Sequence, residues 1–187
     1  MENKSTNIYL EANPNPNSLK FVADHMLVEP GQNFDFPDVE STKFAPLAAE
    51  LFGYPYVRRV FYMSNFITVT KTEDKQWIEI QDELKDHIKK YLETGKPMLH
   101  EGALDVIEEE TEMDIKIKGL LEEYIKPAVE QDGGAIEYKS FEDGVVKVFL
   151  QGSCSGCPSA TVTLKSGIEN LLKSMVPEVK SVEAEEV

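Results

Sequence analysis

The segment Val145–Met175 reads VVKVFLQGSCSGCPSATVTLKSGIENLLKSM and decides the fold of the C-terminal part of the chain. Its first part, Val145–Leu150, is rich in β-branched and other apolar residues, which predicts a strand. A loop of small residues follows, and it contains both cysteines of the chain, Cys154 and Cys157. From Pro158 onward, apolar residues recur every three or four positions, which predicts an amphipathic helix. The apolar positions of this helix are Val162, Leu164, Ile168, Leu171, Leu172 and Met175.

The residues on either side of this segment complete a small domain. A helix is expected around Ile117–Val129, and Gly133-Gly134 ends it. Strands are expected at Ala135–Phe141, before the Asp143-Gly144 turn, and at Val179–Val182. The order helix–strand–strand–helix–strand predicts a small sheet covered by helices.

The N-terminal half alternates strand and helix signals. Asn13–Asn17 alternates Asn with Pro, a pattern that excludes helix and predicts a turn. The expected strands are Ile8–Leu10, Leu19–Val22, Val57–Met63 and Phe66–Thr70, and the expected helices are Ser41–Phe52 and residues 72–95. No set of nucleophile, base and orienting residue is recognisable in this half, so we expect no catalysis there.

The 187 residues are enough for two small domains. We predict an α+β protein with an N-terminal domain at residues 1–95, an acidic linker at 96–112 and a C-terminal domain at 113–187. The linker prediction rests on a Lys96-Pro97 breaker and a run of acids, because closely spaced like charges resist burial. The alternative is the polar face of a short helix whose apolar residues Leu104, Val106 and Ile107 contact a domain.

The charge balance narrows the classes of partner. There are 19 Lys and Arg against 34 Asp and Glu, a formal net charge of −15. This charge repels phosphate backbones and anionic lipids, so we expect neither nucleic acid nor membrane as a partner. No apolar stretch has the roughly 20 residues of a membrane helix, and Met1–Ser5 does not open a signal peptide or an import sequence. The expectation is a cytoplasmic protein.

Two cysteines in one Cys-x-x-Cys are too few for a secreted disulfide scaffold, and they indicate metal binding or thiol–disulfide exchange. Pro158 suits the first position of a helix, which would place Cys157 near the helix N-cap, where a thiolate is stabilised. Gly152 and Gly156 leave backbone N–H groups free to approach bound sulfur. The loop therefore suits a soft metal ion or an iron–sulfur cluster held by Cys154 and Cys157.

The number of ligands predicts a dimer. A zinc ion or a closed iron–sulfur cluster generally takes four protein ligands, and one chain offers two thiolates. His25, His87 and His100 lie far from the loop in sequence, and we expect them to be surface or satisfied core residues. Two chains that meet at their loops supply four cysteines by symmetry, which favours a cluster-bridged homodimer. A cluster at such an exposed seam is readily transferred.

An extended pattern around the cysteines carries a family resemblance. Its stretches are Ile125-Lys126-Pro127-Ala128-Val129, Asp132-Gly133-Gly134, Gly152-Ser153-Cys154-Ser155-Gly156-Cys157-Pro158-Ser159, Thr161-Val162-Thr163-Leu164-Lys165 and Gly167-Ile168-Glu169. With them, residues from about 113 to 183 closely resemble the C-terminal domain of NifU-like (Nfu-type) iron–sulfur scaffold and carrier proteins. Through Asn13–Phe21 and Phe66–Lys71, residues from about 6 to 95 resemble the N-terminal domain of the same family.

The resemblance implies that Cys154 and Cys157 ligate an iron–sulfur cluster shared between two subunits. The cluster implied is commonly 4Fe–4S, with 2Fe–2S also possible, and it is passed to apo-proteins after upstream machinery has supplied it. The central cysteine-rich and catalytic scaffold parts of full-length NifU are absent, so the sulfur must be generated elsewhere, and we expect a carrier that is not an enzyme. Two alternatives stay open: a dithiol oxidoreductase with Cys154 as nucleophile and Cys157 resolving, and a zinc-bridged dimer.

Overall fold

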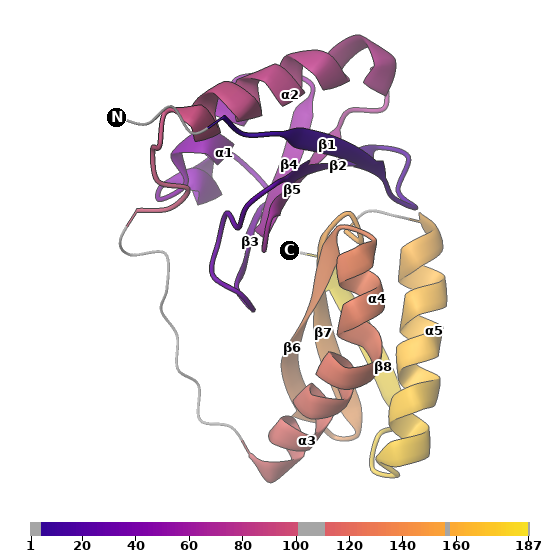
Figure 1. Cartoon of the computed structure of the whole chain (residues 1–187). Helices are drawn as coiled ribbons and strands as arrows, with labels where there is room; N and C mark the ends of the chain where they lie inside the picture. The colour runs from indigo at the N-terminus through magenta and orange to yellow at the C-terminus, as the bar shows by residue number, and fades with distance from the viewer. Residues whose placement is uncertain (1–4, 101–110, 156–157, 187) are drawn as a thin grey trace. The chain divides into compact units, whose positions relative to one another are not determined.

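The computed structural model describes residues 5–100, 111–155 and 158–186, with the backbone alone at 158–161 and 186. The chain divides into two compact units, Met1–Asp105 and Val106–Val187, and each is described by itself. The predicted α+β class is confirmed, because both units combine helices with a sheet (Figure 1).

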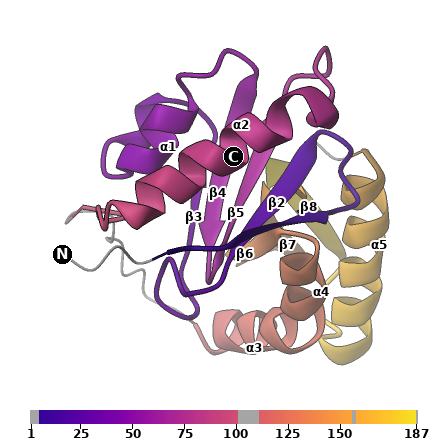
Figure 2. The same cartoon turned by 45° about the horizontal axis from the view of Figure 1, so that its top comes forward.

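A five-stranded antiparallel sheet forms the framework of the N-terminal unit. Its spatial order is β1-β2-β5-β4-β3. The strands are β1 (Ile8–Ala12), β2 (Ser18–Ala23), β3 (Asn33–Phe36), β4 (Val57–Met63) and β5 (Phe66–Lys71). Helices α1 (Pro46–Leu51) and α2 (Trp77–Glu93) cover one face of this sheet (Figure 2).

Alternation along the strands builds the core under these helices. Phe21, Ile67 and Tyr62 lie side by side on neighbouring strands, and each is 0% exposed. The apolar stripe of α2 supplies the other side of the core through its buried residues Ile80, Leu84, Ile88 and Tyr91. Trp77 is partly buried against this core, and its ring meets Phe21 edge-on.

Two details of the N-terminal unit differ from the sequence expectation. The helix expected at Ser41–Phe52 is a 3₁₀ turn, η1 (Glu40–Thr42), followed by the separate helix α1. Pro46 explains the break, because proline disfavours helical backbone in the preceding residue, and Ala45 has a ψ of 81°. Strand β3 was not expected, since its four residues, Asn33–Phe36, are too few and too polar to give a strand signal.

The C-terminal unit has the predicted order of elements. An N-terminal helical segment comprises α3 (Glu112–Leu120), a π-helical turn η2 (Leu121–Ile125) and α4 (Lys126–Gln131). Strands β6 (Gly134–Glu142) and β7 (Val145–Gly152), helix α5 (Pro158–Met175) and strand β8 (Ser181–Glu186) follow. The sheet order is β6-β7-β8, antiparallel between β6 and β7 and parallel between β7 and β8.

One face of this sheet packs against the helices. Val146, Val148 and Leu150 of β7 share a buried cluster with Ile117 of α3 and Ile168 of α5. Figure 1 shows α4 and α5 on the same side of the three strands. The predicted turn between β6 and β7 is present, because Asp143 and Gly144 have φ values of 53° and 87°, as a tight hairpin requires.

The π-helical turn was not expected from the sequence. Pro127 has no N–H, and inside a regular helix its ring would clash with the carbonyl four residues earlier. The wider turn at Leu121–Ile125 lies directly before Pro127, and Ile125 has a φ of −109°. We attribute the π turn to this proline, which the helix accommodates without ending.

Candidate functional site

Cys154 lies just past the end of β7, at the point where the chain turns toward α5. The turn begins at Gly152, whose φ of 63° lies in the left-handed region that favours glycine. Cys154 is 5% exposed and belongs to the buried cluster of its own unit. Cys157, the second predicted ligand, lies outside the described residues.

The turn between α4 and β6 supports the cysteine loop. The backbone N–H of Ser153 donates to the carbonyl oxygen of Gly133 over 3.3 Å. The hydroxyl of Ser153 donates to the carbonyl oxygen of Asp132. Gly133 has a φ of 79° and ends α4 as predicted, so this glycine both stops the helix and accepts a bond from the loop.

Gly134 provides the space that Cys154 occupies. A β carbon at position 134 would lie 2.7 Å from the Cys154 sulfur and 2.7 Å from the carbonyl oxygen of Gln151. Both distances are shorter than side chains tolerate, so only glycine fits without moving the cysteine. The close packing leaves the sulfur little room to move, and a thiolate there has the chemistry that iron–sulfur clusters require of their ligands.

The helix that follows the loop favours a negatively charged ligand. Helix α5 begins at Pro158, as predicted, because the fixed φ of proline suits the first helical position. The first backbone N–H groups of a helix have no partner within it, and the helix dipole adds partial positive charge. A cluster carried by thiolates at this end would gain from both effects.

Two of the three histidines have partners within the N-terminal unit. His87 contacts the Tyr54 hydroxyl through Nδ1 and the Glu50 carboxylate through Nε2, each at 2.9 Å. His25 contacts Asp24 over 3.0 Å. Among the residues that the structure describes, no group of three or more His, Cys, Asp and Glu side chains could hold a metal ion.

The Glu50–His87–Tyr54 chain is a contact that the sequence did not predict, and it has the outline of an orienter, a base and a nucleophile. Burial raises the pKa of Tyr54, and the nearby charge of Glu83 raises it further. A raised pKa favours the protonated hydroxyl, which suits a hydrogen-bonded structural role. We interpret the chain as a link between α1 and α2.

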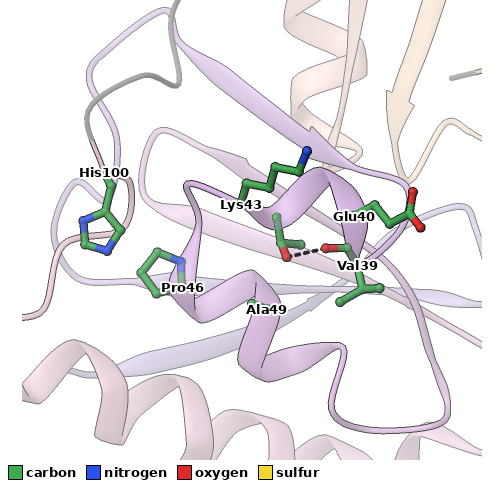
Figure 3. Close-up of a pocket in the computed structure, with 7 residues that line it drawn as sticks. Val39, Glu40, Lys43, Pro46, Ala49 and His100 are labelled. Carbon is green, nitrogen blue, oxygen red and sulfur yellow. Dashed lines mark hydrogen bonds between the residues drawn. The ribbon is translucent and has the colours of Figure 1, made fainter.

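The N-terminal unit also has a hollow of about 470 Å³ (Figure 3). It is lined by Val39, Glu40, Thr42, Lys43, Pro46, Ala49 and His100. Figure 3 shows Glu40, Lys43 and His100 spread around the rim, so their polar groups do not converge on one point.

The described helices of the chain include none that is long and apolar enough to cross a membrane.

Comparison with protein families agrees with both halves of this description. The model of the NifU-like domain matches residues 117–183, and the model of the N-terminal domain of scaffold protein Nfu/NifU matches residues 8–95. The chain belongs to the Nfu-type, NifU-like family. The predicted resemblance is therefore confirmed for both of its domains.

Curated members of the family are similar along nearly the whole chain. The "NFU1 iron-sulfur cluster scaffold homolog, mitochondrial" of Drosophila willistoni is 42% identical over 180 residues, covering 94% of this chain and 62% of that protein. "NifU-like protein 4, mitochondrial" of Arabidopsis thaliana is 44% identical over 186 residues, covering 95% of this chain and 65% of that protein. The Nfu-type chain thus spans a little under two thirds of the length of these relatives.

Among solved structures, the NMR structure of a NifU-like protein from Saccharomyces cerevisiae aligns with a TM-score of 0.48 at 23% identity. The alignment covers 54% of this chain and 90% of that one.

The expectation of a cytoplasmic location is wrong. The similar Nfu-type proteins from Drosophila and Arabidopsis are named mitochondrial, and they point away from the cytoplasm. The expectation rested on the acidic composition and on the N-terminal residues Met1–Ser5, in which neither a signal peptide nor an import sequence was recognisable. Neither feature identifies the compartment.

Gly134 and Ser153 are the residues of this site that sequence reasoning missed as contributors. The glycine pair was interpreted only as a helix end, and the serine only as a small loop residue. The register of β6 against β7, which pairs Gly134 with Gly152, brings the two segments together. A local motif does not reveal that pairing.

Proposed function

We propose that this chain is an iron–sulfur cluster scaffold or carrier, and that it acts without catalysis. The cluster is its cargo, bound by Cys154 and Cys157 and then transferred to apo-proteins. The observation that supports this most is the close packing of Cys154 against Gly134, in the loop that precedes α5. The names of the relatives, which include an iron–sulfur cluster scaffold homolog, support the same function.

We also propose that the cluster is 4Fe–4S and is shared by two copies of the chain. One chain contributes two cysteines in total. Closed clusters generally take four protein ligands, so two loops related by a two-fold axis complete the set. Loss of one partner leaves such a cluster half ligated, which suits delivery to an acceptor.

The proposed division of labour follows the domains. Residues 113–187 bind the cluster, residues 96–112 are an acidic linker, and residues 1–95 recognise acceptor proteins or the upstream machinery that supplies the cluster. Most of the proposed linker lies outside the described residues. We favour a recognition role for the N-terminal domain over a catalytic one. Its ionisable groups Glu50, His87 and Tyr54 bond to one another and link helices of the domain.

Native mass spectrometry after anaerobic reconstitution with iron and sulfide tests the function. A dimer that carries the added mass of one 4Fe–4S cluster is the expected result. A dimer with a 2Fe–2S mass would correct the cluster type only. A monomer without iron that differs by two hydrogens between oxidised and reduced samples would contradict the proposal and favour dithiol redox chemistry.

Substitution of one cysteine tests the shared site. In Cys154→Ser, a dimer retains two thiolates in place of four, so we expect bound iron to fall by on the order of tenfold or more. The iron and acid-labile sulfide content of the reconstituted protein is the measurement. Ser155→Ala is the matched control in the same loop and retains normal iron content. A full cluster in Cys154→Ser would rule out bridging through this residue.

A further inference from the structure

We propose that Ser153 is a positioning residue for the cluster, and that its hydroxyl sets the placement of the Cys154 thiol. This inference rests on the proposed function and assigns a role to a residue that does not itself ligate. It follows from the contacts that connect the cysteine loop to the α4–β6 turn.

Ser153 is bound to that turn at two points. Its N–H donates to the Gly133 carbonyl over 3.3 Å, and its hydroxyl donates to the Asp132 carbonyl. Ser153 is 2% exposed, so water does not readily replace either bond. A carbonyl left without its donor in such a place is unfavourable, which strengthens the preference for the closed loop.

The position of Cys154 depends directly on these bonds, because its backbone follows that of Ser153. The contact with Gly134 leaves little tolerance, since a single added carbon at position 134 would lie 2.7 Å from the sulfur. Ligands of a preorganised site must stay within roughly 0.5 Å of their working geometry. Ser153 therefore fixes the thiol from the backbone side, while Gly134 leaves the space for it.

Ser155 offers a matched comparison. It is also buried, at 6% exposed, and its N–H donates to the Gly152 carbonyl over 3.2 Å. This bond runs within the cysteine loop, whereas both Ser153 bonds reach the α4–β6 turn. Replacing Ser155 by alanine thus removes a buried hydroxyl from the same loop and leaves both Ser153 bonds in place.

Alkylation of the apo-protein tests the role without any cluster. The full-length chain is prepared with Cys157→Ser, so Cys154 is its remaining thiol. The rate of its reaction with iodoacetamide is followed by mass spectrometry. With Ser153→Ala added, we expect alkylation about five- to tenfold faster, the effect of losing one hydrogen bond to a buried acceptor. With Ser155→Ala, we expect a change within about twofold on the same reasoning.

A conservative variant separates the hydroxyl from general packing. Ser153→Thr retains the donor, so we expect its alkylation rate near that of the parent. Equal rates in Ser153→Ala and Ser155→Ala would overturn the proposal. If Ser153→Ala fails to fold, Ser153→Thr decides alone: a rate more than tenfold above the parent overturns the role of the hydroxyl.

The loaded protein gives a second readout. With both cysteines present, Ser153→Ala should lose its cluster to a chelator about fivefold faster than Ser155→Ala, with a changed visible circular dichroism spectrum. If the wild-type chain assembles no cluster but alkylation responds as expected, the proposed function fails and the positioning role of Ser153 stands. If the wild-type cluster forms and the two alanine variants behave alike, only the role of Ser153 fails.

Discussion

A missing side chain at Gly134 determines where the Cys154 sulfur can lie. Its absent β carbon would approach both that sulfur and the Gln151 carbonyl oxygen to 2.7 Å. In Gly134→Ala, the added methyl must displace the cysteine or the end of β7. We expect severalfold lower cluster content after reconstitution and an unfolding free energy lower by about 1–3 kcal/mol, as for overpacked cores. Iron analysis and urea unfolding are the measurements.

Gly119 of α3 gives the matched control. A β carbon there would meet no heavy atom within 4 Å. Because glycine weakens the interior of a helix, we expect Gly119→Ala to leave cluster content unchanged and to stabilise the unit by about 0.5–1 kcal/mol. A loss of iron in this variant equal to that in Gly134→Ala would contradict the role assigned to the close contact.

At this scale, the sequence indicates the candidate ligands but not the residues that support them. Cys154 and Cys157 stand out because two thiols at this spacing have few other uses. Gly134 and Ser153 act through contacts between segments about 20 residues apart, and Asp132 contributes only a backbone oxygen. A side-chain pattern does not show which backbone oxygen accepts a hydrogen bond. These supporting contacts therefore become visible only in the folded structure.

Helix α3 begins with a capping box that is also linked to the sheet. Thr111 and Asp114 bond reciprocally, and the Tyr138 hydroxyl of β6 donates to the same carboxylate. These hydrogen bonds, from Thr111 first and Tyr138 second, lower the pKa of Asp114 below its ordinary value of 3.8. The ionised carboxylate therefore joins the start of the helix to β6.

The pH dependence of this link has a definite sign. A lowered pKa in the folded state stabilises the fold above the ordinary pKa, and the effect is lost as the pH falls through the lowered value. We expect Asp114→Asn to reduce the unfolding free energy at pH 7 by about 1 kcal/mol, as for other lost caps. The difference from wild type should shrink from about pH 5 downward. Urea unfolding followed by circular dichroism at both ends of this range measures it.

Glu112→Gln is the control for charge alone, because it removes one negative charge from the same first turn of α3. Its effect should be smaller, since the helix dipole at an exposed position contributes only about 0.3–1 kcal/mol. If the two variants lose equal unfolding free energy, the hydrogen bond between Asp114 and Tyr138 adds no stability beyond the effect of the negative charge.

Elements with long, regular patterns were predicted well, and short or irregular ones were not. The apolar stripe of α2 and the β-branched runs of β4 and β5 are long enough to distinguish helix from strand in the local sequence. Strand β3 forms by antiparallel pairing with β4, for example between Phe36 and Val60. Such tertiary pairing is absent from the local sequence.

The whole chain comprises two units with separate buried clusters, one in Met1–Asp105 and one in Val106–Val187. Each unit thus has the main requirement for folding on its own. The single tryptophan, Trp77, lies in the first unit, so its fluorescence reports the unfolding of that unit.

Deletion of residues 1–95 tests the division of labour between the units. We expect the remaining chain to bind iron to at least about half of the full-length level and to differ in the apo-proteins that it serves, because the cysteine loop is supported from within its own unit. Reconstitution followed by transfer to two different apo-proteins is the measurement. Full-length chain with Cys154→Ser is the control for iron bound elsewhere. Loss of cluster assembly in a deletion variant that retains its circular dichroism would contradict this division.

The parallel pairing of β7 with β8 has a consequence for the newly made chain. Val146 of β7 lies beside Val182 of β8, and both belong to the cluster that buries Cys154. Synthesis proceeds from the N-terminus, so the ribosome makes the cysteines before it makes the strand that completes their sheet. The Cys154 thiol therefore emerges before the strand that completes its buried cluster. Under the proposed function, cluster insertion would follow translation of this unit, and the nascent thiols would have to stay reduced until then.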